Sequence, residues 1–470
     1  MNYGFVSRTS GRGGADRLEF RTDALAKPTT APQFAIKSPP REGVYDLHLS
    51  LYAKRLTTSL VKGKPVAARI LQFVVLETQP LPVPHVSQEF HLVQEIDPTK
   101  AHWWEKMGRM KALKNLSTMN SGSVGSEKAQ TRAYLGKNLL ELKANGWHAY
   151  PLELERPGEP HRLEIEYPSD WRQSVSISIV EPNASGQVVP IGVDSAIEVR
   201  EPSLSTAPGL QKATLEFWPK TRMPWVLIAN RRDDRAALLG KLSLYAGPAN
   251  LLPMELGQGT GLAGGETGAA GPGGRQLLAY LDRPLLAENF SATQAVDRET
   301  GRSLEDWQTA YEAGTRLVEH LKRHGYTGAV LTVACEGGTI YPSQKLEPTP
   351  QWDSGIFFES GQDPMRKDVV EMLHRLFDRA GLTLVPAIKF STPLPALEQE
   401  IRQDANWLGG LMPVGADGKT WVQRNGVQRG QGVFYNTLDP RVQQAMRDVL
   451  EELSQRYGHH RSFGGVCVPW

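Results

Sequence analysis

The last part of the chain, residues 276–470, alternates amphipathic segments with short apolar runs. Apolar side chains recur at helical spacing over residues 304–323, after residues 363–364 and again after residues 439–440. A run of strand length follows each of these segments, and a fourth run precedes the first. This alternation predicts four parallel strands separated by three helices. The predicted strands are residues 277–281, 328–334, 382–388 and 463–468.

The ends of the three predicted helices carry recognisable signals. Ser303 is the expected N-cap of the first helix, with Asp306 three residues later, and Gly325 follows as a stop. An aspartate followed by proline begins each of the other two helices. Glycines then end them, at Gly381 and Gly458.

Two folds are built from such alternation, the open doubly wound sheet and the closed (β/α)8 barrel. An open nucleotide-binding sheet expects a glycine-rich turn after its first strand, whereas residues 282–289 contain no glycine. The long aromatic and charged loops after the second and third strands favour the barrel. Because a full barrel needs about 250 residues and eight strands, we expect residues 276–470 to form an incomplete TIM-type barrel. The C-terminal barrel half would then be missing, and the sequence would be a fragment.

The region before the predicted barrel reads as all-β. Residues 41–248 hold short, alternating strand segments separated by turn signals, which predicts an antiparallel β-sandwich. A polar stretch at residues 96–132 interrupts this pattern and is expected to be a helix-and-loop insertion. Residues 1–40 are basic, rich in Gly and Ser, and predict disorder. Residues 249–275 are glycine-rich, with no strand before them and no helix after them, which favours a linker over a phosphate-binding loop.

Composition narrows the function classes. The net charge of +2, from 53 basic and 51 acidic residues, argues against a nucleic-acid partner. No apolar run approaches the roughly 20 residues of a membrane-spanning segment. The first residues lack the apolar core of a secretory signal, so either the protein is cytoplasmic or its natural start lies elsewhere. Cys335 and Cys467 end predicted strands and read as core residues. His459 and His460 have no matching ligand nearby in the sequence, so a surface turn is expected rather than a metal site, and no cofactor.

The candidate chemistry lies where the predicted strands end, because barrels carry their sites at the carboxyl ends of their strands. Two carboxylates on either side of a sugar can hydrolyse a glycosidic bond, as acid and base or as acid and nucleophile. The catalytic candidates are Glu336, Asp282 and Asp353. Charged and aromatic neighbours can hydrogen-bond to a carbohydrate substrate or stack on its rings. The candidates for substrate binding are Arg283, Tyr341, Trp352, Lys389 and Trp470.

Other interpretations of these residues stay open. Asp282 can instead form an ion pair with Arg283 or Lys389, and each aromatic ring can serve packing alone. Lys389, between apolar and aromatic residues, also fits the Schiff-base amine of an aldolase.

Three motifs are more specific than the alternation. They are Thr339-Ile-Tyr-Pro-Ser343, Leu384-Val-Pro-Ala-Ile-Lys-Phe390, and Tyr435-Asn-Thr-Leu-Asp-Pro-Arg-Val442 with the Tyr-Gly and Phe-Gly-Gly that follow it. With them, residues 307–470 resemble the N-terminal barrel half of the family-10-like glycosyl hydrolases, a group of bacterial proteins. The resemblance implies a polysaccharide-cleaving parent that acts outside the cytoplasm, and a sandwich similar to accessory carbohydrate-binding domains.

The resemblance does not supply the catalytic pair. In related retaining glycosidases the acid/base is a Glu after the fourth strand and the nucleophile ends the seventh, but residues 466–470 contain no Glu. The interpretation from another class is a non-catalytic carbohydrate-binding or cell-surface structural protein.

Overall fold

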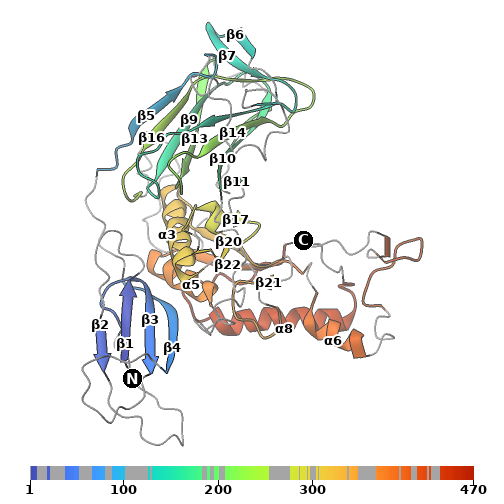
Figure 1. Cartoon of the computed structure of the whole chain (residues 1–470). Coiled ribbons are helices and arrows are strands. Elements are labelled where there is room, and N and C mark those ends of the chain that lie inside the picture. The colour runs from blue at the N-terminus through green and yellow to red at the C-terminus, as the bar shows by residue number, and fades with distance from the viewer. Residues whose placement is uncertain are drawn as a thin grey trace, which may run out of the picture. The chain divides into compact units, whose positions relative to one another are not determined.

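The computed structural model divides the chain into two compact units. We call Val83–Pro253 with Leu285–Ser303 the sandwich unit, and Met1–Pro82, Met254–Pro284 and Leu304–Trp470 the α/β unit. Their elements are labelled in Figure 1. The structure describes residues 2–7, 18–21, 38–51, 66–79, 87–100, 125–126, 130–182, 188–190, 195–200, 207–252, 276–284, 286–293, 295–296, 303–304, 306–335, 338–347, 367–390, 393–403, 410–420, 423–424 and 435–469.

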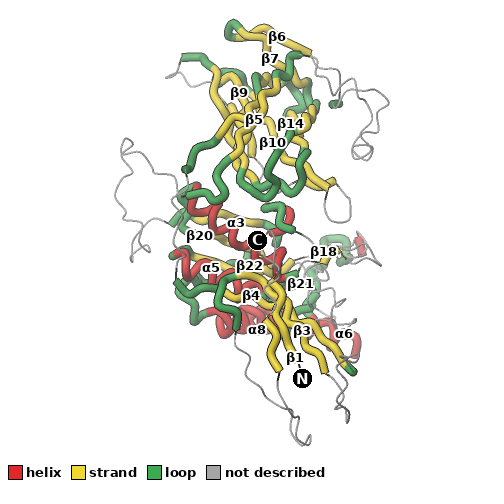
Figure 2. Tube along the Cα trace, turned by 60° about the vertical axis from the view of Figure 1, so that its left-hand side comes forward, coloured by secondary structure: helices red, strands yellow, loops and turns green. Residues whose placement is uncertain are grey.

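The sandwich unit consists mainly of antiparallel sheets, one in the order β13-β9-β16-β5 and one in the order β11-β10-β14-β8, with β12 added to β10. A small sheet, β15-β7-β6, completes it. Figure 2 shows this unit as strands and loops, apart from the short helix α2 (Leu286–Asn289). The strands are β5 (His91–Ile96), β6 (Gln130–Tyr134), β7 (Lys137–Leu142), β8 (Trp147–Pro151), β9 (His161–Pro168), β10 (Gln173–Pro182), β11 (Val188–Pro190), β12 (Ser195–Val199), β13 (Leu210–Phe217), β14 (Trp225–Asn230), β15 (Ala237–Leu239) and β16 (Leu242–Ala246).

Alternation along the strands builds the core of this unit. Leu163 and Ile165 on β9 are buried, and so are Val175, Ile177 and Ile179 on β10, and these side chains belong to one apolar cluster. The residues between them on both strands are polar and partly exposed, up to Ser178 on β10. Successive strand side chains point to opposite faces, so this pattern fills the space between two sheets. The predicted β-sandwich is confirmed.

A separate antiparallel sheet in the α/β unit has the order β2-β1-β3-β4. It consists of β1 (Asn2–Ser7), β2 (Leu18–Arg21), β3 (Gly43–Leu51) and β4 (Ala67–Val75). The sequence analysis expected residues 43–75 in the sandwich and residues 1–40 to be disordered. Both expectations are wrong for these strands, because β3 pairs with β1 and β4 rather than with any sandwich strand.

A parallel sheet forms the centre of the α/β unit. Strands β17 (Leu278–Leu281), β20 (Gly328–Cys335) and β22 (Thr383–Ile388) pair side by side in chain order. Parallel bridges from β22 to Phe463 and Cys467 continue this order toward the fourth predicted strand. A Cβ atom on Gly328 would lie 2.0 Å from the Thr383 carbonyl oxygen, so only glycine permits this approach of β20 to β22. Strand β21 (Gly338–Thr339) turns back against the end of β20.

Helices α3 (Trp307–Arg323), α5 (Val369–Ala380) and α8 (Pro440–Tyr457) separate these strands along the chain, and α6 (Pro395–Gln403) follows β22. Asp439 is the N-cap of α8, with proline in the first turn as predicted. Helix α3 is capped by Asp306 rather than by Ser303, and α5 by Asp368 rather than near residues 363–364. In both helices the capping aspartate accepts a backbone N–H of the first turn with its carboxylate.

None of the helices in the described ranges has the length and hydropathy needed to cross a membrane. The predicted insertion and the predicted linker fall mostly outside the described residues, which resume at Gly125 and at Gln276.

Candidate functional site

Asp282 and Lys389, both predicted from the sequence, meet at the carboxyl edge of the parallel sheet. Asp282 follows β17 directly and Lys389 follows β22 directly. The Lys389 ammonium group donates to Asp282 Oδ1 over 2.5 Å, and the Tyr280 hydroxyl donates to the same oxygen over 3.0 Å. The Lys389 backbone N–H donates to the Ala334 carbonyl near the end of β20, which holds the residue in register. We call Tyr280, Asp282 and Lys389 the strand-end cluster.

The charges of the strand-end cluster are set by its ion pair. The hydrogen bond from Lys389 is the main cause that lowers the pKa of Asp282, with Tyr280 adding to it. Partial burial and the hydrogen bond to Asp282 raise the pKa of the Tyr280 hydroxyl. The Asp282 side chain is 61% exposed and that of Lys389 26% exposed. At neutral pH the cluster therefore presents an ionised, accessible carboxylate beside an ammonium group and a phenol.

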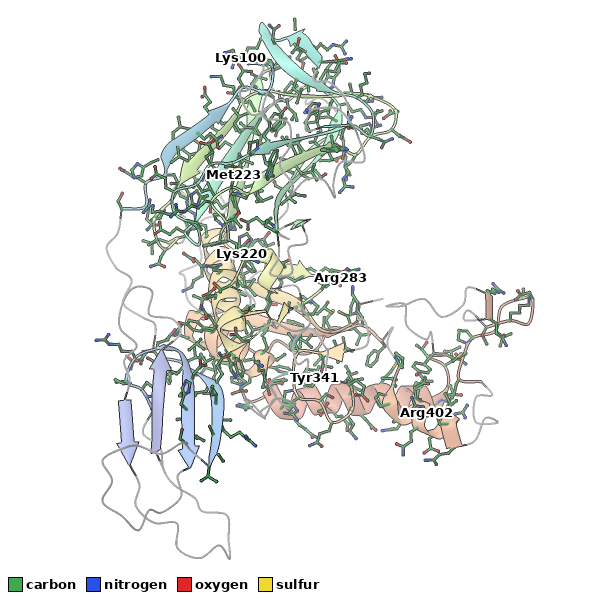
Figure 3. All side chains as sticks on the ribbon, viewed as in Figure 1. Lys100, Lys220, Met223, Arg283, Tyr341 and Arg402 are labelled. Atoms are coloured by element: carbon green, nitrogen blue, oxygen red, sulfur yellow. The ribbon has the colours of Figure 1, made fainter. Side chains whose placement is uncertain are left out.

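The other predicted site residues have different positions (Figure 3). Arg283 is exposed and follows Asp282. Tyr341 is only 2% exposed, and its ring lies edge-on to Tyr457 with the centroids 6.1 Å apart. Burial raises the pKa of the Tyr341 hydroxyl. A ring enclosed in this way is not open for stacking on a sugar, so the expected stacking role of Tyr341 is not supported. Glu336, Trp352, Asp353 and Trp470 lie outside the described residues.

A second polar group lies between α5 and the turn after α8. His460 donates from Nδ1 to Asp378 Oδ2 over 2.6 Å and from Nε2 to Glu371 Oε2 over 2.9 Å. Burial opposes the charged imidazole, but the hydrogen bonds to the two carboxylates raise the pKa of His460. The Asp378 carboxylate also accepts the Ser462 backbone N–H over 2.6 Å. Helix α5 and the 459–462 turn are therefore joined by charged hydrogen bonds.

His374 completes this polar group from inside the protein. Its side chain is fully buried, and its ring is stacked on that of His460 with the centroids 5.0 Å apart. Its Nδ1 donates to Ser462 Oγ over 2.9 Å, because the Ser462 hydroxyl itself donates to the His374 carbonyl. Burial, and then the neighbouring His460, lower the pKa of His374 to about 4. The Nε2 atom has no hydrogen-bond partner within the described part of the chain.

The sequence analysis missed most of this second group. It expected a surface turn at His459 and His460 with no further ligand, because Glu371 lies 89 residues before His460 in the chain. The structure brings Glu371 to both histidines. The available signal was helical spacing: Glu371, His374 and Asp378 recur at intervals of three and four, which places them on one face of α5.

In the sandwich unit, the Trp171 ring lies beside a second aromatic ring and a cation. The Arg132 guanidinium lies 4.9 Å from the centre of the Trp171 ring. The Tyr134 ring meets Trp171 edge-on at 5.2 Å. The Trp171 indole N–H donates to the Ala236 carbonyl over 2.9 Å, and the Tyr134 hydroxyl donates to Asp170 over 2.7 Å. These bonds fix both rings, while the Arg132 side chain stays 47% exposed. We call Arg132, Tyr134 and Trp171 the Trp171 cluster.

No protein-family model and no curated protein matches this sequence. Among solved structures, the chain is similar to a xylan-binding domain from Paenibacillus barcinonensis, at 10% identity and a TM-score of 0.25, over 35% of this chain and 99% of that domain. It is also similar to an exo-β-1,3-galactanase from Phanerochaete chrysosporium, at 11% identity and a TM-score of 0.19, over 26% of this chain and only 27% of that enzyme. A carbohydrate-binding module in complex with calcium and xylotriose is similar at 14% identity and a TM-score of 0.20, over 32% of this chain and 99% of that module.

These similarities are too weak to establish a function, since all three TM-scores are 0.25 or lower. The family-10-like barrel also stays a proposal, because no family model matches the sequence.

Proposed function

We propose that the α/β unit is the first part of a (β/α) barrel that hydrolyses glycosidic bonds, with the strand-end cluster in its substrate site. The observation that carries this proposal is the meeting of Asp282 and Lys389 at the carboxyl edge of parallel strands that pair in chain order. A doubly wound sheet reverses its strand order at the point where it binds ligands, whereas barrels keep chain order and bind substrates at this edge.

Asp282 suits a role that needs an ionised carboxylate. Its pKa is lowered by the hydrogen bond from Lys389, so it does not hold a proton that it could give to a leaving group at neutral pH. It can accept hydrogen bonds from sugar hydroxyls, or act as base or nucleophile. We assign the Asp282 carboxylate to the side of the sugar opposite the general acid.

Glu336 is the proposed general acid. It follows Cys335, which ends β20, the strand between β17 and β22. A proton donor directly after that central strand could protonate the leaving group of a sugar whose hydroxyls are bound by the other strand ends. Asp353, from the same long loop, is the reserve candidate for this role.

The contacts of Lys389 favour this proposal over an aldolase. A Schiff-base lysine attacks a carbonyl as the free amine, whereas the Lys389 ammonium group is held in an ion pair with Asp282. Trapping with borohydride and a carbonyl substrate is therefore expected to leave Lys389 unmodified.

The test compares two aspartates that both pair with a basic side chain. Asp282→Asn removes the charge from the strand-end cluster, while Asp234→Asn does the same for an Asp–Arg pair in the sandwich unit. Release of reducing ends and binding are measured across a panel of polysaccharides, with the complete barrel present for the measurement of turnover. We expect Asp282→Asn to lower kcat/KM by about 100-fold or more and Asp234→Asn to leave it unchanged. The proposal is wrong if no glycan is cleaved or bound, or if the two variants behave alike.

Carbohydrate binding without hydrolysis is the second candidate, and the Trp171 cluster favours it. A tryptophan ring that is fixed in place by its own N–H can stack on a sugar ring at little entropic cost. Trp171→Ala is expected to abolish glycan retention in affinity electrophoresis, whereas Trp147→Ala, which removes another half-buried tryptophan of the same unit, is not. Equal retention by the two variants would exclude this binding surface.

A further inference from the structure

Three side chains of the α/β unit present possible metal ligands to one another. One ligand atom each from Glu371, His459 and His460 lies within 4.8 Å of the others. Glu371 belongs to α5, and the two histidines belong to the turn after α8. Ligand atoms around a tetrahedral zinc ion lie about 3.3 Å apart when each bond is about 2.0–2.1 Å. The pair His460 Nε2 and Glu371 Oε2, at 2.9 Å, is already that close, so only His459 has to approach.

We propose that Glu371, His459 and His460 bind a divalent transition-metal ion, with Zn²⁺ as the best match. Two imidazoles and one carboxylate, with a water as fourth ligand, form a ligand set that suits zinc. In the metal-free protein a proton lies between Nε2 of His460 and the Glu371 carboxylate, and the ion takes the place of that proton. The other Glu371 oxygen, Oε1, accepts from Arg375 over 2.7 Å and stays free of the metal.

Asp378 orients the central ligand. It accepts the Nδ1 proton of His460 over 2.6 Å, which leaves Nε2 directed at Glu371. A metal-binding histidine ordinarily donates its other ring N–H to a carboxylate or carbonyl in this way, which fixes the tautomer and increases the basicity of the ligand. Asp378 is itself held by the Ser462 backbone N–H. Both the ligand and the group behind it are therefore in place.

His374 gives an independent indication of an incomplete polar site. It is fully buried, stacked on His460, and its Nε2 lacks a partner among the described residues. A buried polar atom without a partner costs free energy unless a water or an ion satisfies it. The polar group around His460 is therefore not fully satisfied by the described residues.

This site is distinct from the strand-end cluster. The turn that carries His459 and His460 lies at the amino end of β22, where the Ser462 carbonyl accepts the backbone N–H of Leu384. Lys389 of the strand-end cluster follows the carboxyl end of the same strand. Five residues of strand separate Leu384 from Lys389 by about 17 Å. The inference is therefore independent of the proposed hydrolase function, and either can fail alone.

The experiment is a titration of the full chain, freed of any histidine tag and treated with a chelator, with Zn²⁺ followed by calorimetry. Saturable binding of one equivalent is expected. His459→Ala and His460→Ala should weaken zinc binding at least tenfold. Asp378→Asn keeps the shape of the side chain but weakens its hydrogen bond to His460, and should weaken zinc binding by about 10- to 100-fold. Co²⁺ as a probe should show the visible absorption of a four-coordinate ion, and Glu371→Gln should lose it.

A second histidine pair of the same unit provides the matched control. The rings of His320 and His324 on α3 lie 4.3 Å apart, against 4.2 Å for His459 and His460, but this pair is not part of a ligand group within the described residues. His324→Ala should leave zinc affinity unchanged. Circular dichroism checks that each variant is folded. The proposal is overturned if no stoichiometric binding occurs, or if binding survives in both His459→Ala and His460→Ala, or if it falls equally in His324→Ala.

Discussion

An ion pair between Glu42 and Arg379 joins the β1–β4 sheet to helix α5. The Glu42 carboxylate also accepts the Tyr311 hydroxyl of α3 over 2.7 Å and the Glu77 backbone N–H over 2.9 Å. Glu42 precedes β3 and Glu77 follows β4, so one carboxylate connects one end of this strand pair to two helices. We expect Glu42→Gln to loosen all of these connections together.

The size of the effect follows from burial. The side chains are 7% exposed for Glu42 and 14% exposed for Arg379, so water replaces the lost partner poorly. Losing one partner of a buried ion pair costs about 3–5 kcal/mol, and the remaining exposure of Arg379 places this case near the lower end. Glutamine keeps one acceptor oxygen for Tyr311 but presents an N–H₂ group where a carboxylate oxygen stood. We therefore expect a loss of about 3 kcal/mol in the local free energy of opening.

Hydrogen exchange followed by mass spectrometry measures this loss locally, which matters because two units need not unfold as one. Peptides from β3, β4 and α5 should exchange faster in Glu42→Gln, while sandwich peptides should not change. Asp417→Asn is the control, because the side chains of Asp417 and Arg424 are 48% and 43% exposed, and an exposed ion pair contributes little. A loss below about 1 kcal/mol for Glu42→Gln, the range of surface pairs, would refute the reasoning.

The pH dependence gives a second check on the same carboxylate. Burial alone would raise the pKa of Glu42, but the hydrogen bonds from Arg379, the Glu77 backbone N–H and Tyr311, together with the charge of Arg379, lower it below its ordinary value of 4.5. A lowered folded-state pKa means that the stabilisation is complete above the unfolded-state pKa and is lost as the pH falls through the folded value. The difference between wild type and Glu42→Gln should therefore be constant at neutral pH and shrink below about pH 4.5.

Two further substitutions test packing and polar burial. A Cβ atom on Gly314 of α3 would lie 3.0 Å from side-chain atoms of Leu373 and Leu376 of α5. Gly314→Val should therefore separate the two helices and lower the free energy of unfolding by about 1–3 kcal/mol, measured by urea denaturation. An unchanged denaturation midpoint would mean that the leucines simply move aside. The Glu181 carboxylate, 2% exposed, accepts both the backbone N–H and the hydroxyl of Thr221 over 2.8 Å. Glutamine can keep the oxygen that Thr221 uses, but Glu181→Gln places an N–H₂ group where Oε2 accepts the Lys220 backbone N–H over 2.9 Å and the Ser291 hydroxyl over 3.0 Å. It should cost about 1–3 kcal/mol in thermal unfolding of the sandwich unit, and equal stability would contradict this account.

The sequence was most informative where periodicity and length agree. Alternating residues at 161–167 and 175–181 predicted β9 and β10, since each faces the core on one side only. The same alternation at 43–51 misled the domain prediction, because it reports a half-buried strand without saying which sheet the strand joins. β3 buries Tyr45 and Leu47 in a small cluster with β4 instead of in the sandwich core. Sheet membership depends on distant pairing, which single-sequence patterns do not contain.

The candidate sites divide in the same way. Asp282 and Lys389 could be brought together from the sequence because the carboxyl ends of parallel strands share one edge of a sheet. Glu371 and His460 come from a helix and a turn, and no comparable rule places those two together. Tyr341 shows what the sequence does not contain: its ring was a candidate for stacking on a sugar, but it is only 2% exposed and lies edge-on to Tyr457 of α8.

The Asp282–Lys389 and Glu42–Arg379 pairs have the same chemistry and opposite roles. The buried pair fixes helices to a sheet, so its loss should reduce stability. The pair at the strand ends has an aspartate that is 61% exposed, and an exposed ion pair contributes little to folding. Packing therefore gives no reason for a carboxylate, an ammonium group and a phenol to gather there. Asp282→Asn should impair glycan turnover and leave the stability of the α/β unit unchanged. Glu42→Gln should lower that stability and leave glycan turnover unchanged while the unit stays folded. If Asp282→Asn instead destabilised the α/β unit as much as Glu42→Gln, the strand-end cluster would be structural and the hydrolase proposal would lose its main support.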